Sequence, residues 1–165
     1  MNLSIKNLLT IIIPRHVHRA EEIKNELEKL NLKVTSHSKK SKKLKDLDIY
    51  LVDTFGETKK FHKLASTVFL GGSIIKRGGQ NPLEAARFGA RILHGKNTDN
   101  FKDIYKFLKS LNVSKQIKTP KQMASSITFK KNNKIGLKIK NIGEKILKKT
   151  INELEKIIKN EIKKT

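Results

Sequence analysis

The stretch FLGGSIIKRGGQNPLEAARFGARILHG, residues 69–95, holds six of the nine glycines of this 165-residue chain. A predicted strand ends at Leu70, and a predicted helix begins near Asn81. Glycine-rich loops between a strand and a helix start allow a ligand to approach the backbone closely, because glycine has no side chain. The stretch therefore predicts an α/β unit with a ligand-binding loop after a strand.

Short β-branched runs alternate with helical patterns on both sides of this stretch. We predict strands at 8–13, 32–36, 48–52, 67–70 and 91–94. We predict helices at 17–30, 57–65, 82–88 and 100–111, a short helix from Pro120, and a lysine-rich loop at 37–45. Such alternation with short links predicts a parallel sheet, and parallel sheets bind ligands beyond the carboxyl ends of their strands.

The end of the chain has a different pattern. Isoleucine and leucine recur at steps of three or four residues from Ile135 to Ile162, which predicts one long amphipathic helix, broken or bent near Gly143. This helix either packs back on the domain or, given its lysines, lies on a membrane surface. We expect one domain over residues 1–131, with the helix of residues 132–165 packed on or beside it.

The composition limits the possible functions. The net charge is +22, but only five of the 37 basic residues are arginine, and Trp is absent. Because bidentate forks and stacking rings are scarce, we do not expect nucleic acid as the partner, whereas an anionic membrane surface stays open. Cysteine is absent, which excludes disulfides and favours a cytoplasmic setting. The longest apolar run is far short of the roughly 20 residues that span a bilayer.

The loop after the fourth predicted strand leads into a well-formed helix start. Asn81 suits the N-cap, Pro82 the first helical position, and Glu84 the carboxylate of a capping box. The motif is either a helix start alone or an anion site, since the free N–H groups at a helix start suit phosphate. In the second case the acceptor-only carboxylate of Glu84 would suit ribose hydroxyls.

Two other loops after predicted strands carry comparable groups. Thr54 and Glu57 have the spacing of a second capping box, after the third strand. Arg15 follows the first strand and can bring a charge-assisted fork to the same edge of the sheet.

No metal site is expected. Asp46 and Asp48 mimic a metal-binding Asp-x-Asp motif but precede their strand, while His16 and His18 have no evident third ligand. Ser73 has no hydrolase elbow around it, and we interpret it as a hydrogen-bonding residue of the glycine loop.

Together these motifs carry a family resemblance. The matching segments are Pro14-Arg15-His16, Asp53-Thr54-Phe55-Gly56-Glu57, Phe69-Leu70-Gly71-Gly72-Ser73, Gly78-Gly79-Gln80-Asn81-Pro82-Leu83-Glu84 and Gly95-Lys96-Asn97-Thr98-Asp99-Asn100-Phe101. In order and approximate spacing they resemble the C-terminal half of the bacterial 3-deoxy-D-manno-octulosonic acid (Kdo) transferases, which transfer Kdo from CMP-Kdo to the lipid A precursor. Val17, Gln80 and Ala85 depart from the usual pattern at the edges of the motifs.

The resemblance implies the Rossmann-like C-terminal domain of a GT-B glycosyltransferase, a parallel sheet with helices on both faces. Carried over residue by residue, it implies a CMP site made of Pro14, Arg15, Phe55, Gly56, Glu57, Asn81, Pro82, Leu83 and Glu84. It implies no cofactor, and it places the general base in an N-terminal acceptor domain that these residues do not supply. We therefore expect the chain to bind the donor without catalysing transfer by itself, at the cytoplasmic face of the inner membrane.

Two other classes of function stay open from the residues. One is a basic module that binds nucleic acid or anionic membrane, and the other is a GT-B half that binds a UDP-sugar. Their ligands differ, so binding measurements separate all three hypotheses.

Overall fold

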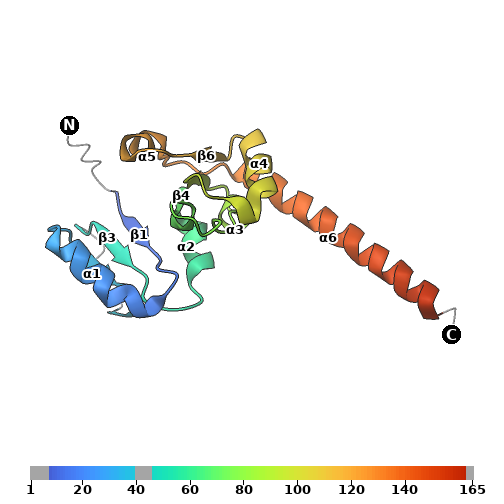
Figure 1. Ribbon diagram of the computed structural model, residues 1–165, viewed down its shortest axis with the longest axis horizontal. Helices are drawn as coiled ribbons and strands as arrows, with labels where there is room; N and C mark the ends of the chain where they lie inside the picture. Colours follow the sequence, from blue (N-terminus) through green and yellow to red (C-terminus); the bar gives the residue numbers. More distant parts are fainter. Residues whose placement is uncertain (1–7, 40–45, 163–165) are drawn as a thin grey trace. The chain divides into compact units, whose positions relative to one another are not determined.

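The computed structural model describes residues 8–39 and 46–162 (Figure 1). The chain forms two compact units, residues 1–61 and 62–165. Each unit contains one three-stranded parallel sheet. The strands predicted as one parallel sheet are therefore distributed over two sheets. The predicted boundary between a domain of residues 1–131 and a helical segment of residues 132–165 stays a prediction.

The sheet of the first unit has the strand order β1-β3-β2. Its strands are β1 (Thr10–Ile12), β2 (Val34–Ser36) and β3 (Ile49–Leu51). A short 3-10 helix (Val17–Arg19) leads into α1 (Ala20–Lys29), so the predicted helix over 17–30 starts with a tighter turn. Leu51 and Val52 are fully buried. Of the predicted loop at 37–45, residues His37–Lys39 form another 3-10 helix, and the other six lie outside the described residues.

Helix α2 (Thr58–Leu64) runs from the first unit into the second. The sheet of the second unit has the order β4-β5-β6, with β4 (Thr67–Leu70), β5 (Arg91–His94) and β6 (Ser114–Gln116). Strands β4 and β5 have the predicted bounds. Strand β6 was not predicted, because its polar Ser-Lys-Gln segment becomes a strand only by pairing with β5.

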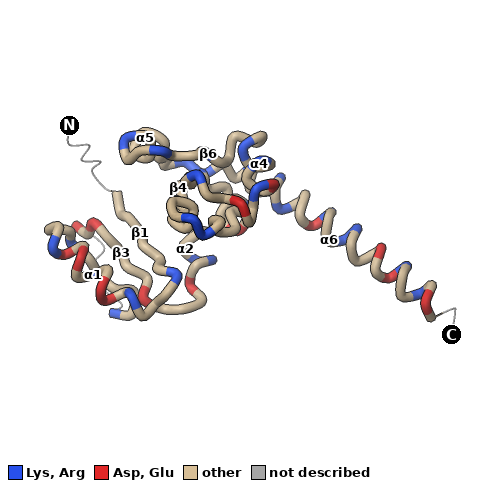
Figure 2. The backbone as a smooth tube through the Cα atoms, viewed as in Figure 1, with Lys and Arg blue, Asp and Glu red and all other residues tan. Residues whose placement is uncertain are grey.

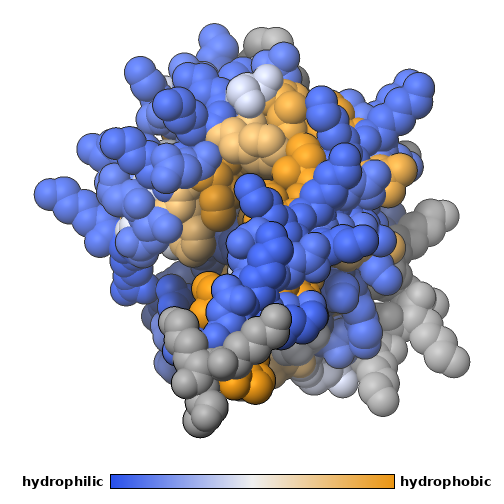
Figure 3. Space-filling model, turned by 90° about the vertical axis from the view of Figure 1, so that its right-hand side faces the viewer, coloured by the Kyte–Doolittle hydropathy of each residue, from blue (hydrophilic) through white to orange (hydrophobic). Residues whose placement is uncertain are grey.

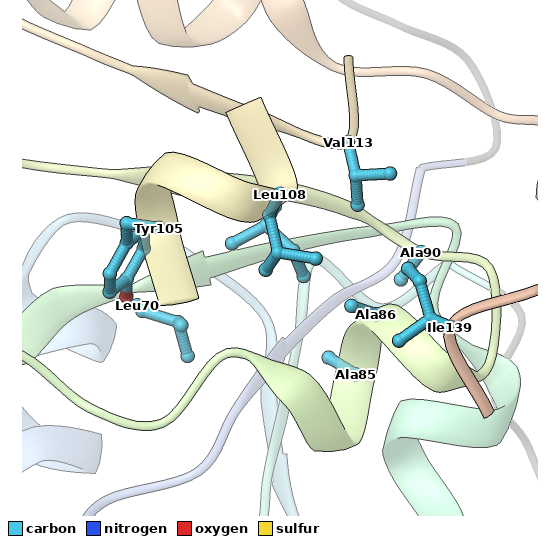
Figure 4. Close-up of a cluster of buried hydrophobic side chains, with 9 residues drawn as sticks. Leu70, Ala85, Ala86, Ala90, Tyr105, Leu108, Val113 and Ile139 are labelled. Carbon is cyan, nitrogen blue, oxygen red and sulfur yellow. The ribbon is translucent and has the colours of Figure 1, made fainter. Parts of the chain in front are cut away.

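The core of the second unit lies between its sheet and helices α3 (Leu83–Arg87), α4 (Lys102–Ser110) and α6 (Asn133–Ile162). Figure 4 shows side chains from these elements in one cluster. Its members are Leu70, Ala85, Ala86, Ala90, Ile92, Tyr105, Leu108, Val113 and Ile139. Alanines on α3 keep that short helix close to the sheet, so the loop before α3 is anchored by the core.

The predicted long helix is α6, which runs for 30 residues without a break through Gly143. It follows α5 (Pro120–Ser126), the short helix expected from Pro120. The first turns of α6 pack on α3, where Gly136 and Ile139 are buried, whereas every residue from 144 to 162 is exposed. No helix within the described residues is both long and apolar enough to cross a membrane.

Candidate functional site

In the first unit, two predicted site segments follow neighbouring parallel strands. Pro14 and Arg15 come after β1, and Phe55, Gly56 and Glu57 come after β3. Because β1 pairs with β3, both segments leave the same carboxyl edge of that sheet. Arg15 is exposed, and the ring of Phe55 is 80% exposed. An arginine and an aromatic ring are thus open to a ligand at this edge.

The loop after β3 is tied to the loop after β2. The Asp53 carboxylate accepts hydrogen bonds from the backbone N–H (2.8 Å) and the hydroxyl (2.5 Å) of Ser38. Burial opposes ionisation of Asp53, but the bonds from Ser38 outweigh it and lower the pKa of this carboxyl. Gly56 has a φ of +81°, a conformation that residues with a side chain rarely adopt. Asp53 and Gly56 therefore fix the path of the chain between β3 and α2.

The capping box predicted from Thr54 and Glu57 is wrong. Helix α2 begins at Thr58, and its first backbone bonds go to the carbonyl of Glu57, so Glu57 itself stands at the cap. The hydroxyl of Thr54 is buried without a hydrogen-bond partner among the described residues. The Glu57 carboxylate instead pairs with Lys60 at 2.9 Å. Thr54 lies too far upstream of the first helical turn to cap it.

In the second unit, the glycine loop after β4 is joined to the loop after β5 through Ser73. The fully buried Ser73 hydroxyl donates to the carbonyl of Leu70 (2.5 Å) and accepts from the N–H of Gly95 (2.6 Å). Asn97 donates its backbone N–H to the carbonyl of Ser73 (2.9 Å) and its side-chain amide to that of Ile74 (2.8 Å). The interpretation of Ser73 as a hydrogen-bonding loop residue is confirmed.

The glycine pair at the end of this loop packs against the loop after β5. Gly78 and Gly79 have φ values of +76° and +80°. The carbonyl of Gly78 accepts from the N–H of Asn100 (3.1 Å), and a Cβ on Gly79 would lie 3.1 Å from the carbonyl oxygen of Asn97. The glycines are thus required for contacts within the chain as well as for any approach by a ligand.

Tyr105 of α4 holds the last residue before the helix start. Its hydroxyl donates to the carbonyl of Gln80 (3.1 Å), and its ring packs on that of His94 with 4.4 Å between centroids. Burial raises the pKa of Tyr105 to about 12. The hydroxyl therefore stays a donor at neutral pH.

The helix start at Asn81 is formed as predicted in one respect and differs in another. The Asn81 side-chain oxygen accepts from the N–H of Leu83 (3.0 Å), the first residue of α3. The N-cap itself is Pro82 and not Asn81, so the prediction of Pro82 at the first helical position is wrong by one residue. Glu84 does not close the capping box with Asn81. Its carboxylate Oε2 lies 3.5 Å from Nδ1 of His62 on α2, and the Glu84 side chain is 49% exposed. Glu84 is therefore free of a capping duty and open to solvent.

The predicted site residues thus form two sets, each at the carboxyl edge of its own sheet. Pro14, Arg15, Phe55, Gly56 and Glu57 belong to the first unit. Asn81, Pro82, Leu83 and Glu84 belong to the second unit and are supported there by the joined loops after β4 and β5.

Sequence reasoning gave no role to His62 or His94, and both are buried. Burial lowers the pKa of each ring, and in His62 the neighbouring Glu84 opposes that shift. His94 Nδ1 lies 2.7 Å from the carbonyl of Gly95. The burial of His94 could have been predicted, because His94 is the last residue of a predicted strand. Nothing in the local sequence pattern indicated that His62 is buried.

The residues weighed as metal ligands do not gather into a site. Within the described part of the chain, no group of three histidines or carboxylates is placed to hold a metal ion. Asp48 accepts from the backbone N–H of Lys33 (2.8 Å) before β3 begins, and His16 and His18 stack with 5.6 Å between ring centroids.

No protein-family model matches the chain. The 3-deoxy-D-manno-octulosonic acid transferase of Rickettsia prowazekii is 36% identical over 148 residues, which are 90% of this chain and 32% of that protein. The transferase of the same name from Haemophilus influenzae is 32% identical over 102 residues, 62% of this chain and 24% of that protein. The chain thus spans at most about a third of the length of these relatives.

A solved structure matches in fold. The C-terminal CMP-Kdo binding domain of WaaA from Acinetobacter baumannii has a TM-score of 0.67 and 27% sequence identity, covering 72% of this chain and 62% of that one. The parallel sheets with their helices and long C-terminal helix are accordingly a GT-B glycosyltransferase domain, as the resemblance implied. The chain belongs to the 3-deoxy-D-manno-octulosonic acid transferase family and corresponds to its C-terminal domain.

Proposed function

We propose that this chain binds CMP-Kdo and serves as the donor side of Kdo transfer to the lipid A precursor. The observation that carries the proposal is the start of α3, where Asn81 accepts from Leu83 and which is held by the core and by the joined loops at the carboxyl edge of its sheet. Supporting it, the matching structure is a CMP-Kdo binding domain. The acceptor lipid would be engaged by residues outside this chain.

In the proposed site each group has a role that its chemistry suits. Arg15 pairs with the donor phosphate, because its exposed guanidinium can bind bidentately. In the second unit, the N–H groups of the first turn of α3 that Asn81 does not bind are the donors for an anion, and Glu84, next to Leu83, accepts from the ribose hydroxyls. In the first unit, Phe55, Gly56, Glu57 and Pro14 contact the nucleotide.

Calorimetric titration tests the proposal and its alternatives. We expect the chain to bind CMP at least about tenfold more tightly than UMP or UDP, a difference of roughly 1.4 kcal/mol. Tighter binding of UDP would favour a UDP-sugar donor. Binding of a short oligonucleotide with a steep salt dependence, and none of CMP, would contradict the proposal in favour of a nucleic-acid module.

In the same titration, Glu84→Gln should weaken CMP binding by roughly 1.5–3 kcal/mol, because a charged acceptor is replaced by a neutral one. Stability should change by less than about 1 kcal/mol, since the Glu84 side chain makes no capping hydrogen bond. The matched control is Glu153→Gln on α6, which removes a carboxylate of an exposed pair with Lys156 and should leave CMP binding unchanged. Equal losses of stability and binding in Glu84→Gln would argue against a ligand role.

We also propose that the chain works at the cytoplasmic face of the inner membrane through the exposed half of α6. Leu147, Ile151, Leu154 and Ile158 recur at helical spacing, and each is at least 45% exposed. Figure 3 views the side toward which α6 points and shows apolar surface among hydrophilic side chains. Residues 144–162 carry five lysines and four glutamates, and both charges alternate along α6 in Figure 2. The apolar stripe therefore supplies most of the affinity in this proposal.

Vesicle flotation measures this contact on the full chain. We expect the chain to float with vesicles that contain phosphatidylglycerol, and a variant with Gln at Leu147, Ile151, Leu154 and Ile158 to stay in the soluble fraction. Substitution is preferable to truncation, because Gly136 and Ile139 of α6 belong to the core. If the unaltered chain and the variant float to the same extent, α6 does not bind the membrane through these residues.

A further inference from the structure

The Glu84 carboxylate has one neighbour whose position is set by the fold. His62 is 9% exposed, and its Nδ1 lies 3.5 Å from Oε2 of Glu84. At this distance the two atoms do not form a hydrogen bond, and the buried Nδ1 has no hydrogen-bond partner among the described residues. Such contacts in unliganded sites often shorten when the ligand binds. A buried ring thus faces a carboxylate that is half open to solvent.

The backbone of His62 is held by Lys131 at the carboxyl end of α2. The ammonium group of Lys131 donates to the carbonyl of His62 (3.3 Å) and to that of Lys63, at the carboxyl end of the helix. A lysine at this end satisfies carbonyls that the helix leaves open and complements its dipole.

The segment that carries Lys131 is itself fixed to the sheet. The N–H of Thr128 donates to the hydroxyl of Thr67 (2.9 Å), that of Asn132 donates to the carbonyl of Gly89 (2.9 Å), and the carbonyl of Phe129 accepts from Ser66 (3.2 Å). The backbone of His62 is therefore held by contacts that do not involve Glu84.

We infer that His62 is a positioning residue for Glu84, whose carboxylate it orients for the ribose of the nucleotide. The inference rests on the proposed binding of CMP. A glutamate side chain open to solvent samples several rotamers, and restricting them before binding lowers the entropy lost in the complex. An N–H from His62 toward Oε2 restricts the carboxylate and leaves its other acceptor positions for the ligand.

The charges around the ring decide how this contact changes with pH. Burial lowers the pKa of His62, Glu84 on α3 raises it in part, and Lys131 lowers it further. Because this pKa is lowered, the ring gains a proton only at a pH below its ordinary value of 6.5, and the proton would give a charge-assisted bond to Glu84. Because the pKa of His62 is lower in the folded chain than in the unfolded chain, protonation of His62 lowers the stability of the fold as the pH falls. The free energy of unfolding must therefore be measured at each pH at which binding is measured.

Two substitutions at His62 separate orientation from packing. His62→Leu removes the donor, and we expect CMP binding at pH 7.5 to weaken about three- to tenfold, the range of one ordinary hydrogen bond. His62→Asn keeps a side-chain N–H donor without a titratable ring, so binding at pH 7.5 should stay within about twofold of that of the unaltered chain. Circular dichroism under each condition shows whether the variants remain folded.

The decisive readout is the ratio of CMP dissociation constants, His62→Asn over the unaltered chain, between pH 7.5 and 5.5. The titration of the CMP phosphate cancels in this ratio. We expect the ratio to rise as the pH falls, since only the unaltered chain gains the charged bond. In a Glu84→Ala background, which leaves no acceptor to orient, His62→Leu should add no further loss.

The remaining outcomes distinguish a failure of the His62 role from a failure of the proposed CMP binding. A constant ratio across this pH range, or a full additional loss from His62→Leu in the Glu84→Ala background, would overturn the positioning role while leaving CMP binding intact. If the unaltered chain binds no CMP at any pH, the proposed function is wrong and the role of His62 is overturned with it.

Discussion

Gly95→Ala is expected to lower the free energy of unfolding by about 3 kcal/mol, the upper part of the usual range for overpacking. A Cβ at this position would lie 2.5 Å from the carbonyl oxygen of Ser73, 2.8 Å from its carbonyl carbon and 3.0 Å from Cα of Ile74. All three are backbone atoms of the glycine loop, so the loop must move and the bond from the N–H of Gly95 to Ser73 is lost. CMP binding should weaken too, because this loop leads to the start of α3.

Gly71→Ala is the matched control, in the same loop. A Cβ at Gly71 meets no atom within 4 Å, and Gly71 does not adopt a positive φ. Its substitution should change stability by less than about 1 kcal/mol. Urea unfolding followed by circular dichroism gives both values from the same linear extrapolation. Similar stabilities for the two variants would show that the loops after β4 and β5 are not in contact as described.

Gly136→Ala should destabilise the chain by about 2–3 kcal/mol although it lies in a helix, where alanine is ordinarily favoured over glycine by about 1 kcal/mol. A Cβ at Gly136 would lie 2.7 Å from the backbone nitrogen of Gly89 and 2.8 Å from the carbonyl oxygen of Arg87. Helix α6 would have to move away from α3 and withdraw Ile139 from the core.

Gly143→Ala, seven residues further along the same helix, should have the opposite sign. The nearest atom to its Cβ is Nη2 of Arg87 at 2.9 Å, the end of a flexible side chain that can move aside. The higher helix propensity of alanine then dominates, and we expect the free energy of unfolding to rise by about 0.5–1 kcal/mol. Thermal and urea unfolding of both variants test the pair. If both glycine substitutions stabilised the chain, the packing of α6 on α3 would be wrong.

The elements best predicted from the sequence are those whose pattern is local. Strands β4 and β5 have the predicted bounds, since each is a short apolar run ended by glycine or a polar residue. A helix start with an Asn81 hydrogen bond was predictable because Asn81, the following proline and Leu83 are adjacent in the chain, although Pro82 and not Asn81 is the N-cap. The length of α6 also followed from its repeat of apolar residues.

The elements that were missed depend on partners distant in sequence. Strand β6 contains no apolar residue and exists through its pairing with β5. The carboxylate of Glu84 was assigned to a capping box, yet it faces His62, 22 positions earlier in the chain. The predicted break near Gly143 is absent, because a single glycine in a long helix lowers its stability by only about 1 kcal/mol.

The sequence by itself determined the alternating α/β order, the placement of the motif residues after strands and the family resemblance, since these depend on periodicity and on residues adjacent in the chain. The tertiary structure alone decided which loops support one another: Ser73 with Gly95, Gly79 with Asn97, and His62 with Glu84. The physical reason is that parallel strands bring their following loops to one edge of a sheet, whatever their separation in sequence, and a hydrogen bond or a close contact depends on that final distance.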